Sequence, residues 1–191
     1  IVVFQPELRS VLERIGRGRN FFVNDSYNKN ERSIDEIVSA MSSLSRQKIG
    51  ALVVIEREVG LNDIIESGTL LRSEISSELL INIFIPNTPL HDGAVIIRDD
   101  LIEAAACYLP LTTNNTLSKE LGTRHRAAIG ISEKSDCLVV VVSEETGTIS
   151  IVSNGTINRY FDEESLKDRL IKELKENENK LNFKRRVDDE Q

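Results

Sequence analysis

The chain has 191 residues, of which 40% are hydrophobic and 29% are charged, and its formal net charge is −7. This composition is typical of one globular domain and excludes a fibrous or largely disordered chain. The net negative charge argues against a nucleic-acid partner, which would need a broad basic surface.

The two cysteines, Cys107 and Cys137, lie in apolar runs without a CxxC spacing. We therefore expect buried thiols in a reducing cytosol, not a disulfide or a zinc site. No stretch of about 20 apolar residues marks a membrane span, and no signal peptide is visible. Because the sequence opens at Ile1 without a methionine, we expect a soluble part of a longer protein.

The first part of the chain predicts two helices followed by a buried strand. Apolar residues at helical spacing predict helices over residues 8–15 and 33–47, and residues 16–30 between them predict a loop. The continuous apolar run over residues 50–55 is typical of a strand that is buried on both faces. Residues 62–66 predict a helical turn.

The middle of the chain predicts a helix and then a hairpin. Residues 76–85 fit a helix or a strand by pattern, and Ser-Ser-Glu at their start with Pro86 after their end favours a helix. Strands are expected over residues 94–97 and 101–109, joined by a tight turn at Arg98-Asp99-Asp100.

A polar loop over residues 110–121 leads to a helix that we expect to start at Gly122-Thr123 and to end near Lys134. Three short strands in a meander follow, and the turns between them are Glu145-Thr146-Gly147 and Ser153-Asn154-Gly155. The expected strands are residues 138–142, 148–152 and 156–160.

Asp162 is expected to cap a last helix that carries Leu166, Leu170 and Leu174. Residues 1–175 then form a single domain, and residues 176–191 form a charged, disordered tail. Helices that alternate with strands and end in a meander predict an α/β fold, in which a central mixed β-sheet is flanked by helices on both sides.

The run His91-Asp92-Gly93-Ala94 stands at the expected start of a strand. As a plain turn it needs no function, because Asp-Gly tolerates positive φ. As a site, Gly93 would let a ligand approach the backbone, and Asp92 would bind a divalent cation or accept a proton from a hydroxyl. His91 would then be a further metal ligand or a solvent-facing neighbour.

The run Gly122-Thr123-Arg124-His125-Arg126 breaks a local rule. If Thr123 caps the helix, the basic residues lie in its first turn, at the positive end of the macrodipole. Cations there cost stability unless an anion shares the site, and a helix N-terminus binds anions. Because successive helix residues point about 100° apart, we expect Arg124 and His125 nearest the ligand and Arg126 against an acidic neighbour. The alternative is a solvated basic patch.

Two further runs lie at expected strand ends. Ser143-Glu144-Glu145-Thr146-Gly147 is either a plain hairpin or a pair of glutamates that position a cation. Tyr108-Leu109-Pro110 would line a base pocket, although strand ends often expose such residues anyway. The chain has neither a P-loop motif nor a GxGxxG loop, so any nucleotide is bound in another way.

Taken together, these runs resemble the motifs of the bacterial diadenylate cyclases, which condense two ATP into cyclic di-AMP and two pyrophosphates. The resemblance covers the chain from about Gln5 to Leu174 and rests on His91-Asp92-Gly93-Ala94, Leu121-Gly122-Thr123-Arg124-His125-Arg126-Ala127-Ala128 and Ser143-Glu144-Glu145-Thr146-Gly147. Residues 5–8 and 77–90 are similar to the membrane-anchored class, in which bilayer-spanning helices precede the cyclase domain. Many members have Gly-Gly at the tip of the last motif, whereas here Thr148 follows Gly147.

The resemblance implies roles for the matching residues. Asp92 acts on the ribose 3′-OH as a base or through a metal ion, and the implied catalytic residues are Asp92, Arg124 and His125. The implied substrate-binding residues are Gly93, Tyr108, Leu109, Thr123, Arg124, His125, Ser143 and Glu145. The implied ligands of a divalent cation, Mn²⁺, Mg²⁺ or Co²⁺, are His91, Asp92 and Glu145.

The resemblance also implies a face-to-face homodimer, because one domain that holds one ATP cannot close the ring. It implies a cell-membrane location with the catalytic domain on the cytoplasmic side, and regulatory partners in the membrane or in cell-wall precursor synthesis. From the residues alone, a nucleotide-sensing module without turnover stays open, since it would share the pocket. A metal phosphohydrolase normally needs several His and Asp ligands, and the chain has only two histidines.

Overall fold

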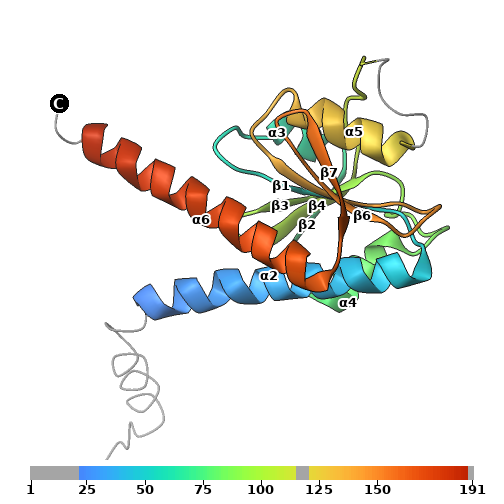
Figure 1. Cartoon of the computed structure of the whole chain (residues 1–191), viewed down its shortest axis with the longest axis horizontal. Helices are drawn as coiled ribbons and strands as arrows, with labels where there is room; N and C mark the ends of the chain where they lie inside the picture. Colours follow the sequence, from blue (N-terminus) through green and yellow to red (C-terminus); the bar gives the residue numbers. More distant parts are fainter. Residues whose placement is uncertain (1–21, 115–120, 189–191) are drawn as a thin grey trace, which may run out of the picture.

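A computed structural model describes the backbone of residues 22–114 and 121–188 and the side chains of residues 31–114 and 121–175 (Figure 1). Within these residues, seven strands form one sheet in the order β2-β4-β3-β1-β5-β6-β7. The strands are β1 (Ala51–Ile55), β2 (Thr69–Glu74), β3 (Ala94–Arg98), β4 (Leu101–Cys107), β5 (Leu138–Val142), β6 (Ile149–Ser153) and β7 (Thr156–Phe161).

The sheet is mixed, and β1 lies at its centre. β1 runs parallel to β3, with Val53 opposite Val95, and antiparallel to β5, with Ala51 opposite Val142. Every residue of β1 and β5 is buried. A strand that is covered on both faces has no polar side to present to water, which explains why both sequences are continuous apolar runs.

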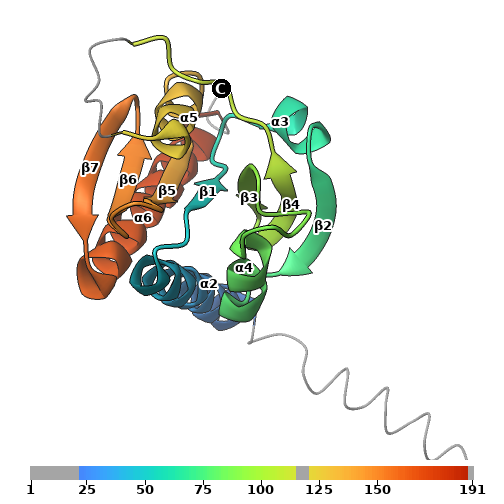
Figure 2. The same cartoon turned by 90° about the vertical axis from the view of Figure 1, so that its right-hand side faces the viewer.

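Helices cover both faces of the sheet (Figures 1 and 2). One face packs against α2 (Phe22–Gln47), α4 (Ser77–Phe84) and α6 (Glu163–Asp188), and the other against α3 (Asn62–Glu66) and α5 (Thr123–Ser132). Each face of the sheet has its own hydrophobic core, and alternate residues of β1 pack into the two cores. Val53 lies on the α2 side, and Leu52 and Val54 lie on the α5 side. The predicted α/β fold with a mixed sheet between helix layers is therefore confirmed.

Several local predictions are confirmed because their signals are local. The Ser76 hydroxyl accepts a hydrogen bond from the Leu79 amide and caps α4, which settles the helix-or-strand question in favour of a helix. The Asp162 carboxylate accepts a hydrogen bond from the Ser165 amide at the start of α6. In the β3–β4 turn, Asp99 and Asp100 have φ values of 48° and 59°, as a two-residue type I′ turn requires.

Other local predictions are wrong. The loop expected over residues 16–30 is helical from Phe22 onwards, since α2 extends beyond the sheet (Figure 1). β2 was not expected, since this edge strand has mostly exposed positions and no clear apolar alternation. β4 ends at Cys107, two residues before the predicted end.

At the C-terminal end, α6 continues to Asp188. The backbone of residues 176–188 is therefore helical, whereas the sequence predicted a disordered tail. The expected helix over residues 8–15 lies outside the described residues. Within residues 22–114 and 121–188, no helix is both long and apolar enough to cross a membrane.

Candidate active site

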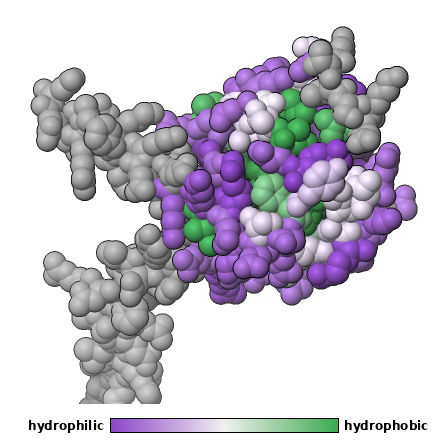
Figure 3. All heavy atoms as spheres, in the orientation of Figure 1, coloured by the Kyte–Doolittle hydropathy of each residue, from purple (hydrophilic) through white to green (hydrophobic). Residues whose placement is uncertain are grey.

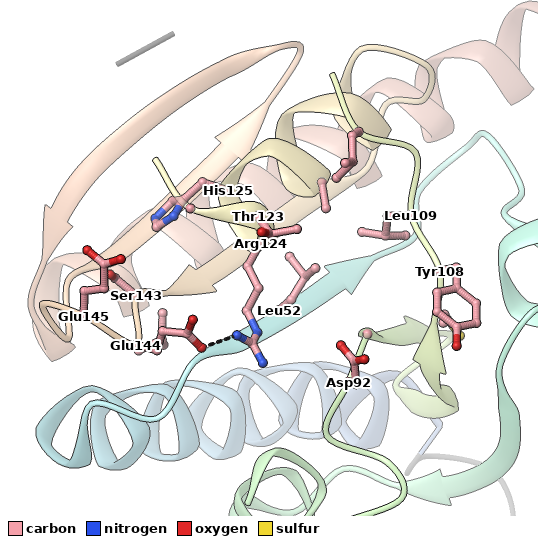
Figure 4. Close-up of a pocket in the computed structure, with 16 residues that line it drawn as sticks. Leu52, Asp92, Tyr108, Leu109, Thr123, Arg124, His125, Ser143, Glu144 and Glu145 are labelled. Atoms are coloured by element: carbon pink, nitrogen blue, oxygen red, sulfur yellow. Dashed lines mark hydrogen bonds and ion pairs between the residues drawn. The ribbon is translucent and has the colours of Figure 1, made fainter. Parts of the chain in front are cut away.

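A pocket of about 450 Å³ lies on the α5 side of the sheet, where three parts of the chain meet (Figure 4). The first turn of α5 forms one wall, the start of β3 and the end of β4 form the second, and the β5–β6 turn forms the third. The predicted site residues that line this pocket are Asp92, Gly93, Tyr108, Leu109, Thr123, Arg124, His125, Ser143 and Glu145.

Gly93 and the end of β4 fit together closely. Gly93 has φ of 128°, and a Cβ atom built there would lie 2.7 Å from the carbonyl carbon of Ala106 and 2.8 Å from the carbonyl oxygen of Cys107. The close approach of the chain's own backbone therefore requires glycine at this position. From the sequence, we had expected the approach of a ligand to be the reason. This contact sets Asp92 directly against the β4 wall of the pocket.

A bulge in β4 sets the direction of the second wall. Ala94 pairs with Cys107 and Ile96 pairs with Ala104, so β4 has one more residue than β3 between these pairs. Ala106 in this bulge has φ of 55°, a left-handed value that is costly for alanine. Tyr108 follows the bulge, and its amide donates a hydrogen bond to the Ser67 hydroxyl at 3.0 Å. The Tyr108 side chain is 69% exposed at the pocket rim.

The N-terminus of α5 opens into the pocket. Gly122 is the N-cap and makes no side-chain cap bond, whereas the sequence had placed the cap at Thr123, which is the first residue of the helix. The first intrahelical bond is donated by the Arg126 amide to the Gly122 carbonyl. The amides of Thr123, Arg124 and His125 therefore have no intrahelical acceptor, which is the geometry of an anion site.

Arg124 faces the pocket and is paired with Glu144. Its Nη1 lies 2.5 Å from Oε2 of Glu144, and Figure 4 shows the guanidinium between this carboxylate and Asp92. The carboxylate offsets a cation placed at the positive end of a helix. From the sequence, Glu144 was considered as one of a pair of glutamates that position a cation, and its pairing with Arg124 was not predicted.

His125 differs from Arg124 although the two are adjacent. The imidazole is only 3% exposed, and its Nε2 is buried with no hydrogen-bond partner among the described residues. Burial, with a smaller contribution from the Arg159 charge, lowers the pKa of His125 from its ordinary value of 6.5. The ring is thus neutral at pH 7, and the expectation of a cluster of cations in this turn is wrong for His125.

Arg126, the third basic residue of the motif, does not line the pocket. Its carbonyl oxygen accepts a hydrogen bond from the Thr112 amide, and this bond ties the segment after β4 to α5. A Cβ atom on Gly130 would lie 2.1 Å from the Pro110 carbonyl oxygen, so α5 must have glycine there for this segment to pack. Leu111 of the same segment lines the pocket and was not predicted.

The β5–β6 turn is anchored on the end of α2. Gly147 has φ of 77°, its amide donates to the Ser143 carbonyl at 2.9 Å, and its carbonyl accepts a bond from the Ser45 hydroxyl at 2.5 Å. Thr148, which follows Gly147, accepts a hydrogen bond from the Thr146 hydroxyl at 2.8 Å and closes the turn. The turn therefore presents Ser143, Glu144 and Glu145 from a fixed base.

The predicted metal cluster of His91, Asp92 and Glu145 is not formed. His91 does not line the pocket, because its Nδ1 lies 2.6 Å from the Thr88 carbonyl oxygen of its own loop. Asp92 and Glu145 lie on different walls of the pocket (Figure 4). Among the residues whose side chains are described, no three His, Cys, Asp or Glu side chains come together as metal ligands.

The charge of the pocket is nevertheless negative. Its lining holds the carboxylates of Asp92, Glu144 and Glu145 and the guanidinium of Arg124, and His125 is neutral at pH 7. A polyanionic ligand could use the amides of α5 and Arg124, but it would still face more negative than positive side-chain charge. Such a ligand needs an accompanying cation.

The chain is similar to known proteins of one family, and the matching region includes the pocket residues. The model of the family described as "DisA bacterial checkpoint controller nucleotide-binding" matches residues 38–157. The cyclic di-AMP synthase CdaA of Bacillus subtilis is 53% identical over 179 residues, which are 93% of this chain and 66% of that protein. The diadenylate cyclase of Listeria monocytogenes is 52% identical over 176 residues, or 91% of this chain and 64% of that protein. The chain thus spans a little under two thirds of the length of these relatives.

Two crystal structures are similar as well. That of DacA from Staphylococcus aureus, a double mutant, has a TM-score of 0.73 at 50% identity and covers 75% of this chain and 95% of that one. That of a hypothetical membrane spanning protein from Bacillus cereus has a TM-score of 0.64 at 49% identity, covering 66% of this chain and 62% of that one. With the family match across the site and relatives more than 50% identical over most of its length, the chain belongs to the bacterial diadenylate cyclase family.

Proposed function

We propose that the chain condenses two ATP molecules into cyclic di-AMP and two pyrophosphates. The observation that carries this proposal is the placement of Asp92 across the pocket from Arg124 and the N-terminus of α5, where a nucleotide's sugar and phosphates would lie side by side (Figure 4). The names of the relatives in Bacillus subtilis and Listeria monocytogenes support the same activity.

Each part of ATP can be matched to a part of the pocket lining. The triphosphate binds at the free amides of α5, with Thr123 and Arg124 as side-chain donors. Adenine lies against Tyr108, Leu109 and Leu111 at the apolar end of the pocket. The ribose then lies between these two regions, with its 3′-OH toward Asp92. His125, in the first turn of α5, also lines the pocket, and we propose that its buried imidazole lies next to the bound triphosphate.

In the proposed reaction, each 3′ oxygen forms a bond to the α-phosphorus of the other ATP. The bond from that phosphorus to the oxygen bridging to the β-phosphate breaks, and pyrophosphate leaves. Asp92 accepts the hydroxyl proton or orients the hydroxyl for its loss. Arg124 and the α5 amides stabilise the charge that grows on the phosphoryl oxygens. Two such steps close the ring.

A divalent cation fits the donor set of this pocket. Asp92 and Glu145 offer carboxylate oxygens, and Mg²⁺ or Mn²⁺ is commonly bound by one or two carboxylates together with substrate phosphates. This arrangement needs no cluster of three protein ligands. The cation would neutralise the phosphates in a pocket of net negative charge and lower the pKa of the hydroxyl.

Catalysis by this route requires two facing copies of the domain, because each copy brings one ATP. The pocket rim carries the exposed side chains of Tyr108 and Leu111, which are 69% and 53% accessible. Large apolar side chains at the mouth of a site favour contact with a second surface. Facing pockets would bring each sugar hydroxyl in line with the opposite α-phosphate.

We further propose that the intact protein is membrane-anchored, with this domain on the cytoplasmic side where ATP is available. The similarity to the Bacillus cereus membrane spanning protein and the greater length of the relatives support this location. Regulatory proteins of the membrane or of cell-wall precursor synthesis are the expected partners.

The direct test is incubation of the purified chain with ATP and either Mn²⁺ or Mg²⁺, followed by mass spectrometry of the nucleotides and a pyrophosphate assay. We expect cyclic di-AMP with two pyrophosphates per ring. ATP binding without either product would contradict turnover and indicate a nucleotide-sensing module. AMP or free phosphate as the product would indicate a hydrolase.

The Asp92→Asn variant tests the role of the carboxylate. We expect cyclic di-AMP formation to fall by about 100-fold or more, because general-base and positioning effects are commonly of that size, while the variant still binds ATP. The measurement is the initial rate at saturating Mn²⁺ beside ATP binding by calorimetry. A wild-type rate at saturating metal would show that the assigned role is wrong.

A further inference from the structure

We propose that Glu144 is a positioning residue that holds Arg124 in its working orientation, and that Gly50 is glycine because the Arg124–Glu144 pair lies over it. This inference rests on the proposed cyclase activity and extends it to two residues to which the sequence motifs gave no positioning role. Neither residue needs to contact the substrate for this role.

The first argument is the place of Gly50 in the sheet. Gly50 directly precedes Ala51, which pairs with Val142 at the end of β5, so Gly50 lies where the β5–β6 turn begins. A Cβ atom at Gly50 would lie 2.7 Å from Nη1 of Arg124 and 3.0 Å from Oε2 of Glu144. The φ of Gly50 is not in the left-handed region, so the backbone does not demand glycine. A methyl group at this position would displace the ends of the Arg124 and Glu144 side chains, so glycine leaves space for the ion pair in this orientation.

The second argument is the geometry of the guanidinium. Glu144 engages Nη1, and the other terminal nitrogen of Arg124 points toward the Asp92 side of the pocket (Figure 4). Because the guanidinium has several donors in a fixed plane, binding at one nitrogen orients the others without using them. The nitrogens that face the cavity are thereby aimed at the proposed phosphate position before the substrate arrives.

The third argument is one of magnitude. The Glu144 side chain is 63% exposed and that of Arg124 is 24% exposed. Ion pairs of such exposure contribute at most about 1 kcal/mol to folding. The ion pair therefore contributes little to the free energy of unfolding. Its larger effect is to hold the long, flexible Arg124 side chain in one rotamer before the reaction, so that the transition state does not bear that entropy cost.

The position of Glu144 also predicts the sign of the kinetic effect. Its negative charge lies near the proposed triphosphate site, so its removal does not weaken the attraction of ATP to the pocket. Loss of the Arg124 orientation reduces the stabilisation of the transition state. A variant without the carboxylate should therefore lose kcat while KM for ATP stays the same or falls.

The experiment compares four variants by steady-state kinetics of cyclic di-AMP formation at one fixed protein concentration. We expect Glu144→Ala and Gly50→Ala each to lower kcat by about 10-fold without raising KM. Glu144→Gln keeps an oxygen that accepts the Nη1 hydrogen bond, so it should keep most of kcat. Gly60→Ala is the matched control for Gly50→Ala, because it adds the same methyl group to an exposed loop with no heavy atom within 4 Å.

Thermal unfolding of each variant shows whether it is folded. If Gly50→Ala does not fold, Glu144→Ala still tests the proposal, because it changes only an exposed side chain. An unchanged kcat for Glu144→Ala, or a higher KM at constant kcat, would overturn the positioning role. So would a Glu144→Gln variant as slow as Glu144→Ala. These results differ from failure of the proposed function, in which the wild-type chain itself makes no cyclic di-AMP.

Discussion

At the scale of single residues, the first turn of α5 shows how burial decides the chemistry of neighbours in the sequence. Arg124 reaches the pocket and is charged, whereas His125, one residue later, is 3% exposed and neutral at pH 7. A helical step of about 100° separates their directions, and although both residues line the pocket, only the guanidinium stays partly exposed. The same turn thus supplies one cation and one uncharged side chain to the lining of the pocket.

The buried His125 predicts that acid destabilises the fold. Its pKa is lowered in the folded state, so below about pH 6.5 the unfolded chain binds a proton that the folded chain does not. The contribution to stability is full above that pH and is lost as the pH falls, by at most about 1.4 kcal/mol per pH unit. Urea unfolding at several pH values between 5 and 7 should show a weaker pH dependence for His125→Gln than for the wild type.

The control for this measurement is His91→Gln, which removes the only other histidine and keeps His125. It should retain the wild-type loss of stability on acidification. If His125→Gln shows the same slope as the wild type, protonation of His125 does not limit stability in this range.

At the scale of elements, the bulge in β4 combines strain with a functional position. Ala106 has φ of 55°, and the extra residue at this point turns Cys107 and Tyr108 toward the pocket. Left-handed alanine costs about 1–2 kcal/mol. Strain of this kind is kept where the surrounding structure requires it, and here the requirement is the close packing of Gly93 against the carbonyl group of Ala106.

Replacing the strained alanine should separate stability from binding. Ala106→Gly relieves the strain but makes the unfolded chain more flexible, so we expect a gain in stability of at most about 1 kcal/mol. KM for ATP should rise a few-fold, because Tyr108 is then held less firmly. Thermal unfolding and steady-state kinetics measure the two effects.

Asn154→Gly is the matched control for Ala106→Gly. Asn154 has φ of 49° in the turn between β6 and β7 and does not line the pocket. It should show a stability change of similar sign with an unchanged KM. A KM that is equally unchanged in Ala106→Gly would mean that the bulge does not position Tyr108.

At the scale of the whole molecule, the proposed reaction divides its work between two copies of the chain. In each copy, Asp92 serves the hydroxyl of the ATP in its own pocket, and Arg124 holds the α-phosphate that is attacked from the other copy. Cyclisation therefore needs two intact carboxylates and two intact phosphate sites, whereas the first bond needs only one of each.

A mixture of two inactive variants should stop the reaction halfway. In a mixed pair of Asp92→Asn and Arg124→Ala subunits, the intact Asp92 activates one hydroxyl and the intact Arg124 holds the phosphate opposite it. One bond forms, and the second lacks both groups. We expect the linear triphosphate dinucleotide and no ring, detected by mass spectrometry.

Each variant alone is the control and should yield neither product. Cyclic di-AMP at an appreciable rate from the mixture would contradict the division of work, as would the absence of the linear product. The wild-type rate should also rise more than linearly with protein concentration wherever the facing pair is not saturated.

The sequence by itself determined the elements whose signals are local and the chemical types at the site. Continuous apolar runs marked β1 and β5, Ser76 and Asp162 marked helix starts, and the motifs around Asp92 and Arg124 named residues that do line one pocket. These features depend on periodicity, capping and residue chemistry, which act over a few positions.

Only the tertiary structure decided which of those groups meet and in what state. The edge strand β2, the pairing of Arg124 with Glu144 over Gly50 and the neutral His125 all depend on residues far apart in the chain. Burial, close backbone approach and ion pairing act through space. A single sequence has no local signal for them.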